Sequence, residues 1–286
     1  MINPITGKNF EPSWRIAEFL PEAIGFYQHI ENQLGRKFWI PMPVLRLAAT
    51  DKEWKKIESK LGSPDVAPWI TAPMISPPGW SGAVELRGGG RLNVPEFLDA
   101  SREFFQSAGC YENAQISGEC RAGEIRCEGA VGLLDGSYGA HRCAKGEILT
   151  VRANGWDESR IRVGAGGWMV PIGGGYFKAG STYEWHHLDT NPTAVGRERI
   201  EAITARLGGP DFEVTEHVAG IRPILRRSQP LMGRYQNGWM FNALGSKGSL
   251  YAPGMADRLA ACLADETEPE PELDFQKFIA QTRTDG

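Results

Sequence analysis

The segment Gly166–Trp185, GGWMVPIGGGYFKAGSTYEW, decides the fold class of this chain. It holds two apolar, partly alternating runs, Trp168–Ile172 and Tyr176–Trp185, on either side of three consecutive glycines. Such runs are typical of antiparallel strands, because the intervening glycines adopt the backbone angles that a tight reversal requires. The segment therefore predicts a β-hairpin.

Strand-like runs next to this hairpin extend it into an antiparallel layer at about residues 145–185. Segments with helical periodicity lie before and after the layer, at 13–34, 51–62, 93–109, 194–209, 250–264 and 275–280. Pro21 is expected to break the first helix, and Asn93 with Glu96 is expected to form a capping box on the third. The order of elements predicts an α+β (mixed α/β) protein, in which βα segments enclose an inserted antiparallel layer.

The composition argues against several classes of protein. The chain has 286 residues and a net charge of -4, so no basic field attracts nucleic acid. No apolar run approaches the roughly 20 residues of a membrane span, and the N-terminus shows no signal-peptide pattern. The five cysteines form no CxxC pair and are odd in number, which favours reduced thiols. We therefore expect a cytoplasmic protein with no nucleic-acid or membrane partner.

Two motifs contain residue types found in ligand-binding sites, but the residues around them argue against a ligand. VGAGGWMVPIGGG (Val163–Gly175) has the glycines of a dinucleotide-binding turn, but a strand follows it where a helix is required, so turn glycines are favoured. EWHHLD (Glu184–Asp189) offers residue types that bind zinc, but its adjacent histidines would point to opposite faces of a strand. We expect a polar loop there and no metal.

Two other segments are stronger candidates. In NALGSKGSLYAPG a glycine-rich turn leads into an apolar helix near Gly248, whose free N–H groups and dipole stabilise anions. An ordinary strand-to-helix turn is the alternative. Arg222 lies between Ile221 and Pro223 on an apolar strand, where a guanidinium must meet an anion or several acceptors. A structural ion pair is the alternative for Arg222, and Arg226 and Arg227 are expected to be solvated.

Seven motifs in a consistent order resemble the FAD-dependent D-amino-acid oxidase superfamily, and most closely its glycine oxidase and sarcosine oxidase branch. They extend from Met1 to about Ala264, and their joint order is more specific than any one of them. The motifs are MINPITG (1–7), GGGRLNVPEFLDA (88–100), RCEGAVG (126–132), AKGEIL (144–149), WMVPIGGGYFKAGSTYEW (168–185), AGIRPILRRSQPLMG (219–233) and LGSKGSLYAP (244–253).

The resemblance implies FAD as the cofactor and assigns residues to it. The turn that lies against the flavin in relatives corresponds to Leu244, Gly245, Ser246, Lys247, Gly248, Ser249 and Leu250. Gly129 is implied as a glycine that FAD approaches closely, and Ile116 as an apolar contact of the adenine end. Arg222 matches the family arginine that binds the substrate carboxylate. Trp168 and Tyr183 fall at positions that line the substrate pocket, with core packing as the alternative for both, so these three are the implied catalytic residues.

The resemblance also predicts how the domains are divided. Relatives begin with a strand, a GxGxxG turn and a helix that hold the ADP half of FAD, and this chain starts with the segment that follows. We therefore expect about forty to fifty residues to be missing before Met1, and FAD to bind weakly. The predicted domains are a Rossmann-like FAD-binding remnant (1–36, 88–144 and 220–264), an interleaved substrate domain with the antiparallel sheet (37–87 and 145–219), and an acidic linker with a short C-terminal helix (265–286).

The implied activity is oxidation of the C–N bond of a small amino acid or secondary amine that carries a carboxylate. In such enzymes a hydride moves to flavin N5 and water hydrolyses the imine. Two alternatives stay open. One is an enzyme like the oxidase domain that modifies the tRNA wobble uridine, against which the acidic composition argues. The other is an inactive or flavin-free fragment that acts as a binding module.

Overall fold

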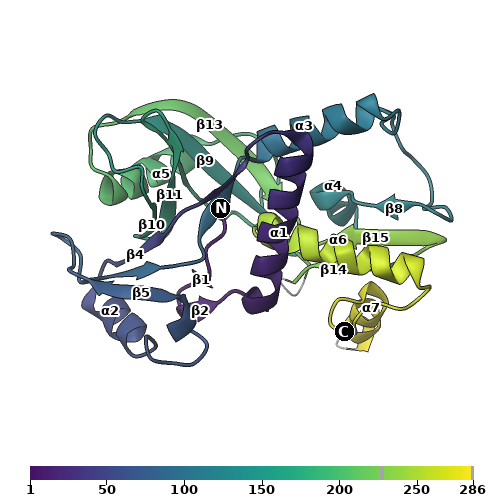
Figure 1. Cartoon of the computed structure of the whole chain (residues 1–286), viewed down its shortest axis with the longest axis horizontal. Helices are drawn as coiled ribbons and strands as arrows, with labels where there is room; N and C mark the ends of the chain where they lie inside the picture. The colour runs from purple at the N-terminus through teal and green to yellow at the C-terminus, as the bar shows by residue number, and fades with distance from the viewer. Residues whose placement is uncertain (226–228, 285–286) are drawn as a thin grey trace. The chain divides into compact units, whose positions relative to one another are not determined.

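The computed structural model describes residues 1–225 and 229–284, which fall into two compact units (Figure 1). Each unit is assembled from three separate parts of the chain: unit 1 from Met1–Ala17, Trp39–Leu92 and Lys145–Gly220, and unit 2 from Glu18–Phe38, Asn93–Ala144 and Ile221–Gly286. The mixed α/β fold class is confirmed. The assignment of an FAD domain and a substrate domain stays a prediction. Arg226 and Arg227 lie outside the described residues.

Unit 1 is built on an eight-stranded sheet in the order β13-β9-β12-β11-β10-β4-β6-β5. Its strands are β4 (Val44–Ala48), β5 (Ile70–Met74), β6 (Gly82–Leu86), β9 (Ala144–Arg152), β10 (Ile161–Gly164), β11 (Gly167–Gly173), β12 (Tyr176–Gly180) and β13 (Glu213–Arg222). The ladders from β9 through β12 and β11 to β10 are antiparallel, as predicted. Outside the predicted layer, β10 pairs with β4 in parallel, so the whole sheet is mixed.

The glycines of the Val163–Gly175 stretch close two hairpins of this sheet. Between β10 and β11, Ala165 and Gly166 have φ values of 50° and 79°. Between β11 and β12, Gly173, Gly174 and Gly175 all have positive φ, which glycine adopts without steric cost. The interpretation of these residues as turn glycines is confirmed.

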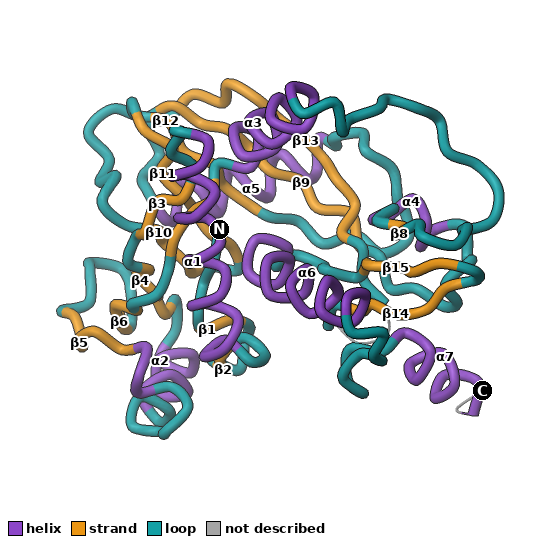
Figure 2. Tube along the Cα trace, turned by 45° about the vertical axis from the view of Figure 1, so that its right-hand side comes forward, coloured by secondary structure: helices purple, strands orange, loops and turns teal. Residues whose placement is uncertain are grey.

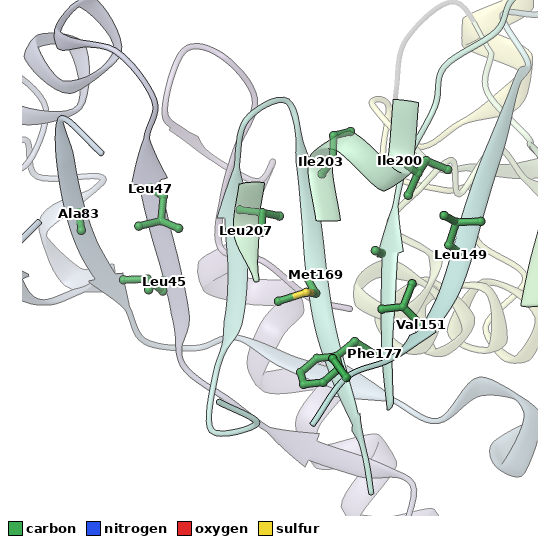
Figure 3. Packing of buried hydrophobic residues seen from close by; sticks show 12 residues of the cluster. Leu45, Leu47, Ala83, Leu149, Val151, Met169, Phe177, Ile200, Ile203 and Leu207 are labelled. Carbon is green, nitrogen blue, oxygen red and sulfur yellow. The ribbon is translucent and has the colours of Figure 1, made fainter. Parts of the chain in front are cut away.

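Helix α5 (Ala194–Leu207) covers one face of the large sheet, as Figure 3 shows from close by. Thr193 caps this helix by accepting a hydrogen bond from the N–H of Gly196 at 3.0 Å. The helix and the sheet together bury a cluster of apolar side chains, which includes Leu45, Leu47, Leu149, Val151, Met169, Phe177, Ile200, Ile203 and Leu207. Each fully buried side chain of this size contributes about 1.5–3 kcal/mol to stability.

A second apolar cluster lies on the opposite face of β4, β6, β10 and β11. The sheet contributes Val44, Ala48, Val84, Leu86, Ile161, Val163 and Val170 to it. Ile5 and Phe10 from the N-terminal segment pack against these residues, together with Ile57 of α2 (Asp51–Glu58). Residues 1–17 therefore belong with the large sheet, although they were predicted within the FAD-binding domain.

Unit 2 contains a small sheet and most of the helices. The elements are α1 (Ile16–Leu34), α3 (Val94–Ser107), β8 (Ile125–Arg126), α4 (Gly129–Leu134), β14 (Leu231–Tyr235), β15 (Gly238–Asn242), α6 (Gly248–Ala264) and α7 (Phe275–Thr284). The sheet order is β14-β15-β8, with β14 antiparallel and β8 parallel to β15. Helices α6 and α7 pack against β14 (Figure 2). No helix in the described part of the chain is long and apolar enough to cross a bilayer.

Three local predictions need correction. Pro21 does not break α1, which continues to Leu34, because a proline early in a helix removes only one interior hydrogen bond. Asn93 precedes α3 but its side chain makes no capping hydrogen bond, and Glu96 pairs with Arg36 at 3.4 Å instead. The acidic C-terminal segment is not simply a solvated linker, since Leu273 and Phe275 are buried.

Candidate functional site

The parallel strands β8 and β15 end at the same edge of the small sheet. Their register pairs Ile125 with Trp239 and Arg126 with Met240. Each strand continues through a turn into a helix, β8 into α4 and β15 into α6. Ligands of α/β proteins bind where the carboxyl ends of parallel strands meet helix N-termini, so this edge is the candidate site of unit 2.

The turn Leu244–Leu250 connects β15 to α6 and leaves several N–H groups free. Gly245 has a φ of 58°, which turns the chain back toward the helix. The N–H groups of Ser246, Gly248 and Ser249 find no acceptor among residues 1–225 and 229–284. A Cβ added at Gly248 would meet only Leu244, at 3.9 Å, so the backbone at this glycine is not closely packed on that side. The turn can therefore donate to an anionic or carbonyl-bearing ligand.

Arg222 lies directly beside this turn within unit 2. It is the last residue of β13, and the next residue, Pro223, accepts a hydrogen bond from the N–H of Gly245 at 3.0 Å. The backbone of the turn also lies against Ile224, since a Cβ built on Gly245 would be 3.6 Å from that side chain. Arg222 is partly exposed. The structure thus brings together the two segments that the sequence had singled out independently.

Asn242 joins the two turns of the site, and no sequence motif pointed to it beyond its place before the glycine-rich turn. Its side chain is 3% exposed, and its amide Nδ2 donates to the carbonyl of Gly129 at 3.0 Å. Its Oδ1 accepts from the N–H of Ala243 at 2.7 Å, and Ala243 has a φ of 62°. The Gly129 turn before α4 and the turn before α6 are therefore held by one buried side chain.

A cavity of about 720 Å³ lies next to the Gly129 turn and is lined in part by Ile116, Arg126 and Glu128. Ile116 is 56% exposed, so its side chain is available to a ligand there. The guanidinium of Arg126 lies 2.9 Å from the carboxylate of Glu124 and 3.6 Å from the carboxylate of Glu128. These two carboxylates neutralise the charge of Arg126. With Asp135 also in the lining, the cavity has more carboxylates than cations. It therefore favours a neutral, hydroxyl-bearing group over a phosphate.

Buried ionisable groups surround both turns. The hydroxyl of Tyr138 donates to Glu128 at 2.7 Å, and burial, reinforced by Glu128, raises the Tyr138 pKa well above its usual range. Burial raises the pKa of Tyr251 to about 12. Burial also lowers the pKa of Lys247, which directly precedes α6. These tyrosines stay neutral at physiological pH and the lysine is easier to deprotonate than usual.

Trp168 and Tyr183 lie in unit 1. Trp168 is on β11, packs partly against the second apolar cluster, and lies across Gly180, where an added Cβ would be 3.1 Å from its ring. Tyr183 is 47% exposed, and its ring centroid lies 6.0 Å from that of Trp185. Their predicted role in lining the substrate pocket stays a prediction.

The EWHHLD segment forms part of a polar loop in unit 1. Glu184 exchanges two backbone hydrogen bonds with Lys145, and its carboxylate accepts from the N–H of His186. Asp189 lies 2.6 Å from the amine of Lys145, which holds the Asp189 pKa below its usual value. Within the described ranges, no three residues among His, Cys, Asp and Glu gather in a way that would hold a metal ion.

Comparison with known proteins gives a consistent picture. Residues 5–262 match the model of the family described as FAD dependent oxidoreductase. The fold is similar to glycine oxidase from Geobacillus kaustophilus, with a TM-score of 0.72 and 18% identity over 92% of this chain and 83% of that one. It is similar to iminodiacetate oxidase from Chelativorans sp. BNC1, with a TM-score of 0.74 and 17% identity over 94% and 88% of the two chains. L-proline dehydrogenase from P. horikoshii has a TM-score of 0.74 and 13% identity over 98% and 87%.

Proposed function

The chain belongs to the FAD dependent oxidoreductase family, and on that premise we propose that it oxidises the C–N bond of a small amine or amino acid that carries a carboxylate. The similar structures include oxidases of glycine and of iminodiacetate and a dehydrogenase of L-proline, all of which are named for substrates of this class. The proposal assigns the cofactor to unit 2 and the carboxylate of the substrate to Arg222.

The residues at the edge of the small sheet fit FAD. The unpaired N–H groups of Ser246, Gly248 and Ser249 suit the electron-rich edge of a flavin, which gains negative charge on reduction. Gly129 has a φ of 57° and nothing within 4 Å of an added Cβ, so a ligand can approach its backbone. We assign Leu244–Leu250 to the flavin on these grounds.

The adenine and ribose end of FAD is assigned to the cavity beside the Gly129 turn. Ile116 offers an apolar surface for a flat ring, and the carboxylates of Glu124 and Glu128 can accept hydrogen bonds from ribose hydroxyls. The same carboxylates disfavour a phosphate inside the cavity. The chemistry of this lining therefore supports the predicted contact between Ile116 and the adenine end.

The chemistry that bound FAD supplies is acceptance of a hydride from the carbon next to the amine nitrogen, after which water hydrolyses the imine. Arg222 binds the substrate carboxylate through its planar fork and thereby orients the amine. The donors of the Leu244–Leu250 turn stabilise negative charge without moving, because the buried Asn242 and the Gly245–Pro223 hydrogen bond fix the turn. Orientation and electrostatic preorganisation are thus the contributions of this chain.

One observation carries the proposal most directly. The N–H of Gly245 donates to the carbonyl of Pro223 at 3.0 Å, so the cofactor turn and the residue after Arg222 are in backbone contact. A flavin turn that was remote from the carboxylate-binding arginine would leave the reacting atoms without a common site. The two segments are adjacent within one unit, as this chemistry requires.

The proposal is tested by purifying the chain, adding FAD and measuring flavin absorbance in the protein fraction. The flavin-loaded protein is then assayed for bleaching by glycine, sarcosine, L-proline and iminodiacetate under anaerobic conditions. Arg222→Ala should raise the KM of the oxidised substrate by tenfold or more while retaining the flavin, since a charge-assisted bidentate contact is lost. Arg234→Ala, which removes an exposed arginine of the same unit, is the control. An unchanged KM in Arg222→Ala removes Arg222 from the site.

A further inference from the structure

Residues 110–118 form an exposed segment between α3 and β8 in unit 2. All residues from 109 to 119 are exposed, and residues 110–118 belong to no helix or strand. In the part of the chain that the structure describes, residues 112–118 make no hydrogen bond with one another or with the rest of the protein. The position of the segment is therefore determined mainly by its two ends.

Both ends of the segment are anchored to unit 2. At the first end, the N–H of Cys110 donates to the carbonyl of Phe105 at 2.8 Å. Beyond the second end, the guanidinium of Arg126 donates to the carbonyl of Glu119 at 3.1 Å, and the next residue, Cys120, is 1% exposed. The segment can therefore change its position without loss of either attachment.

A glycine lies next to each anchor. Gly109 and Gly118 have φ values of 67° and 82°, which glycine adopts without steric cost. A Cβ added at either glycine would meet nothing within 4 Å, so no neighbouring atom blocks rotation of the backbone there. When a loop closes, a few residues at its ends absorb the change in backbone angles. Gly109 and Gly118 are placed where such hinges are needed.

The segment lines the cavity of about 720 Å³, through residues that include Ile116 and Gly118. Apolar side chains from three different elements are exposed around this cavity. Ile116 of the segment is 56% exposed, Ile125 of β8 is 42% exposed and Val131 of α4 is 79% exposed. Covering apolar surface is favourable in water, so a flat ring bound in the cavity gains from contact with these side chains.

The loop 181–193 of unit 1, between β12 and α5, shows how a fixed loop of this protein is held. Glu184 exchanges two backbone hydrogen bonds with Lys145, and the amine of Lys145 donates to Asp189 at 2.6 Å. At the end of the loop, the hydroxyl of Thr193 donates to the buried carboxylate of Glu147 at 2.8 Å. Residues 112–118 have no such bonds, so their movement breaks none.

We propose that residues 110–118 are a lid that closes over the adenosine end of FAD, with Ile116 as the side chain that covers the adenine ring. The inference rests on the proposed function for the identity of the ligand. The closed position gains its apolar contacts only when a ring occupies the cavity, so the ligand is what stabilises it. FMN and riboflavin lack adenosine and therefore leave the lid open.

Hydrogen exchange of the natural chain tests whether the segment closes. In the ligand-free protein, the amides of residues 112–118 should exchange at close to the rate of an unfolded peptide, because they have no hydrogen-bond acceptors. FAD, and adenosine at millimolar concentration, should slow this exchange by about tenfold or more. FMN and riboflavin should leave it unchanged. The loop 181–193 is the internal control and should not respond to adenosine.

Ile116→Asn and Leu98→Asn form a matched pair of variants. Leu98 lies on α3 outside the cavity and is 51% exposed, so neither change should lower the thermal midpoint of the ligand-free protein. Ile116→Asn should weaken FAD binding by about tenfold and change FMN binding by less than twofold, because the lost contact is with adenine. It should also leave residues 112–118 in rapid exchange when FAD is bound. Leu98→Asn should change none of these.

These measurements keep the lid distinct from the proposed function. If no flavin binds, slower exchange of residues 112–118 with adenosine still supports the lid, and only the proposed function fails. If FAD binds without slowing that exchange, the lid is refuted and the proposed function stands. Slow exchange in the ligand-free protein, equal slowing by FMN, or no slowing by FAD and adenosine also overturns the proposal, as does an equal loss of FAD affinity in Ile116→Asn and Leu98→Asn.

Discussion

Replacing Asn242 by alanine should destabilise unit 2 and loosen the proposed cofactor site at the same time. The side chain of Asn242 donates to the carbonyl of Gly129 at 3.0 Å and accepts from the N–H of Ala243 at 2.7 Å. Alanine provides neither group. The turn before α4 and the turn before α6 would then lose the side chain that joins them.

The expected cost follows from the two hydrogen bonds and from their burial. Each bond contributes about 0.5–1.5 kcal/mol net, and each buried partner left unpaired costs about 1–3 kcal/mol. The N–H of Ala243 has little access to water, since Ala243 is 1% exposed, whereas Gly129 is only partly buried as a residue. We therefore expect Asn242→Ala to lower the free energy of unfolding by about 2–4 kcal/mol.

The assay is urea unfolding followed by tryptophan fluorescence, together with FAD titration of each folded variant. Asn237→Ala is the matched control, because it removes an exposed asparagine from the same β14–β15 hairpin and should change stability by less than about 0.5 kcal/mol. Asn242→Asp retains the acceptor for Ala243, but it places a buried carboxylate against the carbonyl of Gly129, so its cost at pH 7 should be at least as large as that of Asn242→Ala. If Asn242→Ala is no less stable than Asn237→Ala, the buried amide does not hold the two turns.

Two further predictions concern the turn itself. Gly248→Ala should leave stability unchanged or raise it by up to about 1 kcal/mol, because the added methyl meets only Leu244 at 3.9 Å, yet it should weaken FAD binding measured by fluorescence titration; equal FAD affinity would place the flavin elsewhere. Lys247→Met should raise the urea midpoint at pH 7. Burial lowers the pKa of Lys247, so the charged amine is less stable in the folded protein than in the unfolded chain, and methionine removes this cost. That gain should shrink as the pH rises toward 10.5, where the unfolded lysine also loses its proton, and a gain that is constant between pH 7 and pH 10 would contradict it.

The sequence predicted those elements that are stabilised by residues close to one another in the chain. The hairpin from β11 to β12 was evident because three glycines separate two apolar runs, and all three have positive φ. By contrast, β10 was not predicted, although it forms the centre of the large sheet. Its four residues, Ile161–Gly164, follow a polar loop, and their parallel partner β4 lies far away in the sequence. Pairing between distant segments leaves no periodic signal in either one.

The capping of α3 shows the same limit at the level of a single side chain. Asn93 and Glu96 have the residue types and the spacing of a capping box, but Asn93 makes no capping hydrogen bond and Glu96 pairs with Arg36. Residue 36 follows α1, so this competing partner is supplied by the tertiary fold. Asn242 was missed for the corresponding reason, because its partner Gly129 lies on a different strand-to-helix turn.

Two arginines of this molecule differ in how far the fold satisfies their charge. Arg258 of α6 contacts three carboxylates, those of Glu18, Glu22 and Glu270, and its guanidinium lies 4.8 Å from the ring centroid of Phe19. Its interactions are complete within unit 2, so its charge is explained by the fold. Arg46 of unit 1 has no comparable ion pair within residues 1–225 and 229–284, and its Nε is buried without an acceptor, so burial lowers its pKa and Glu53 only partly opposes this.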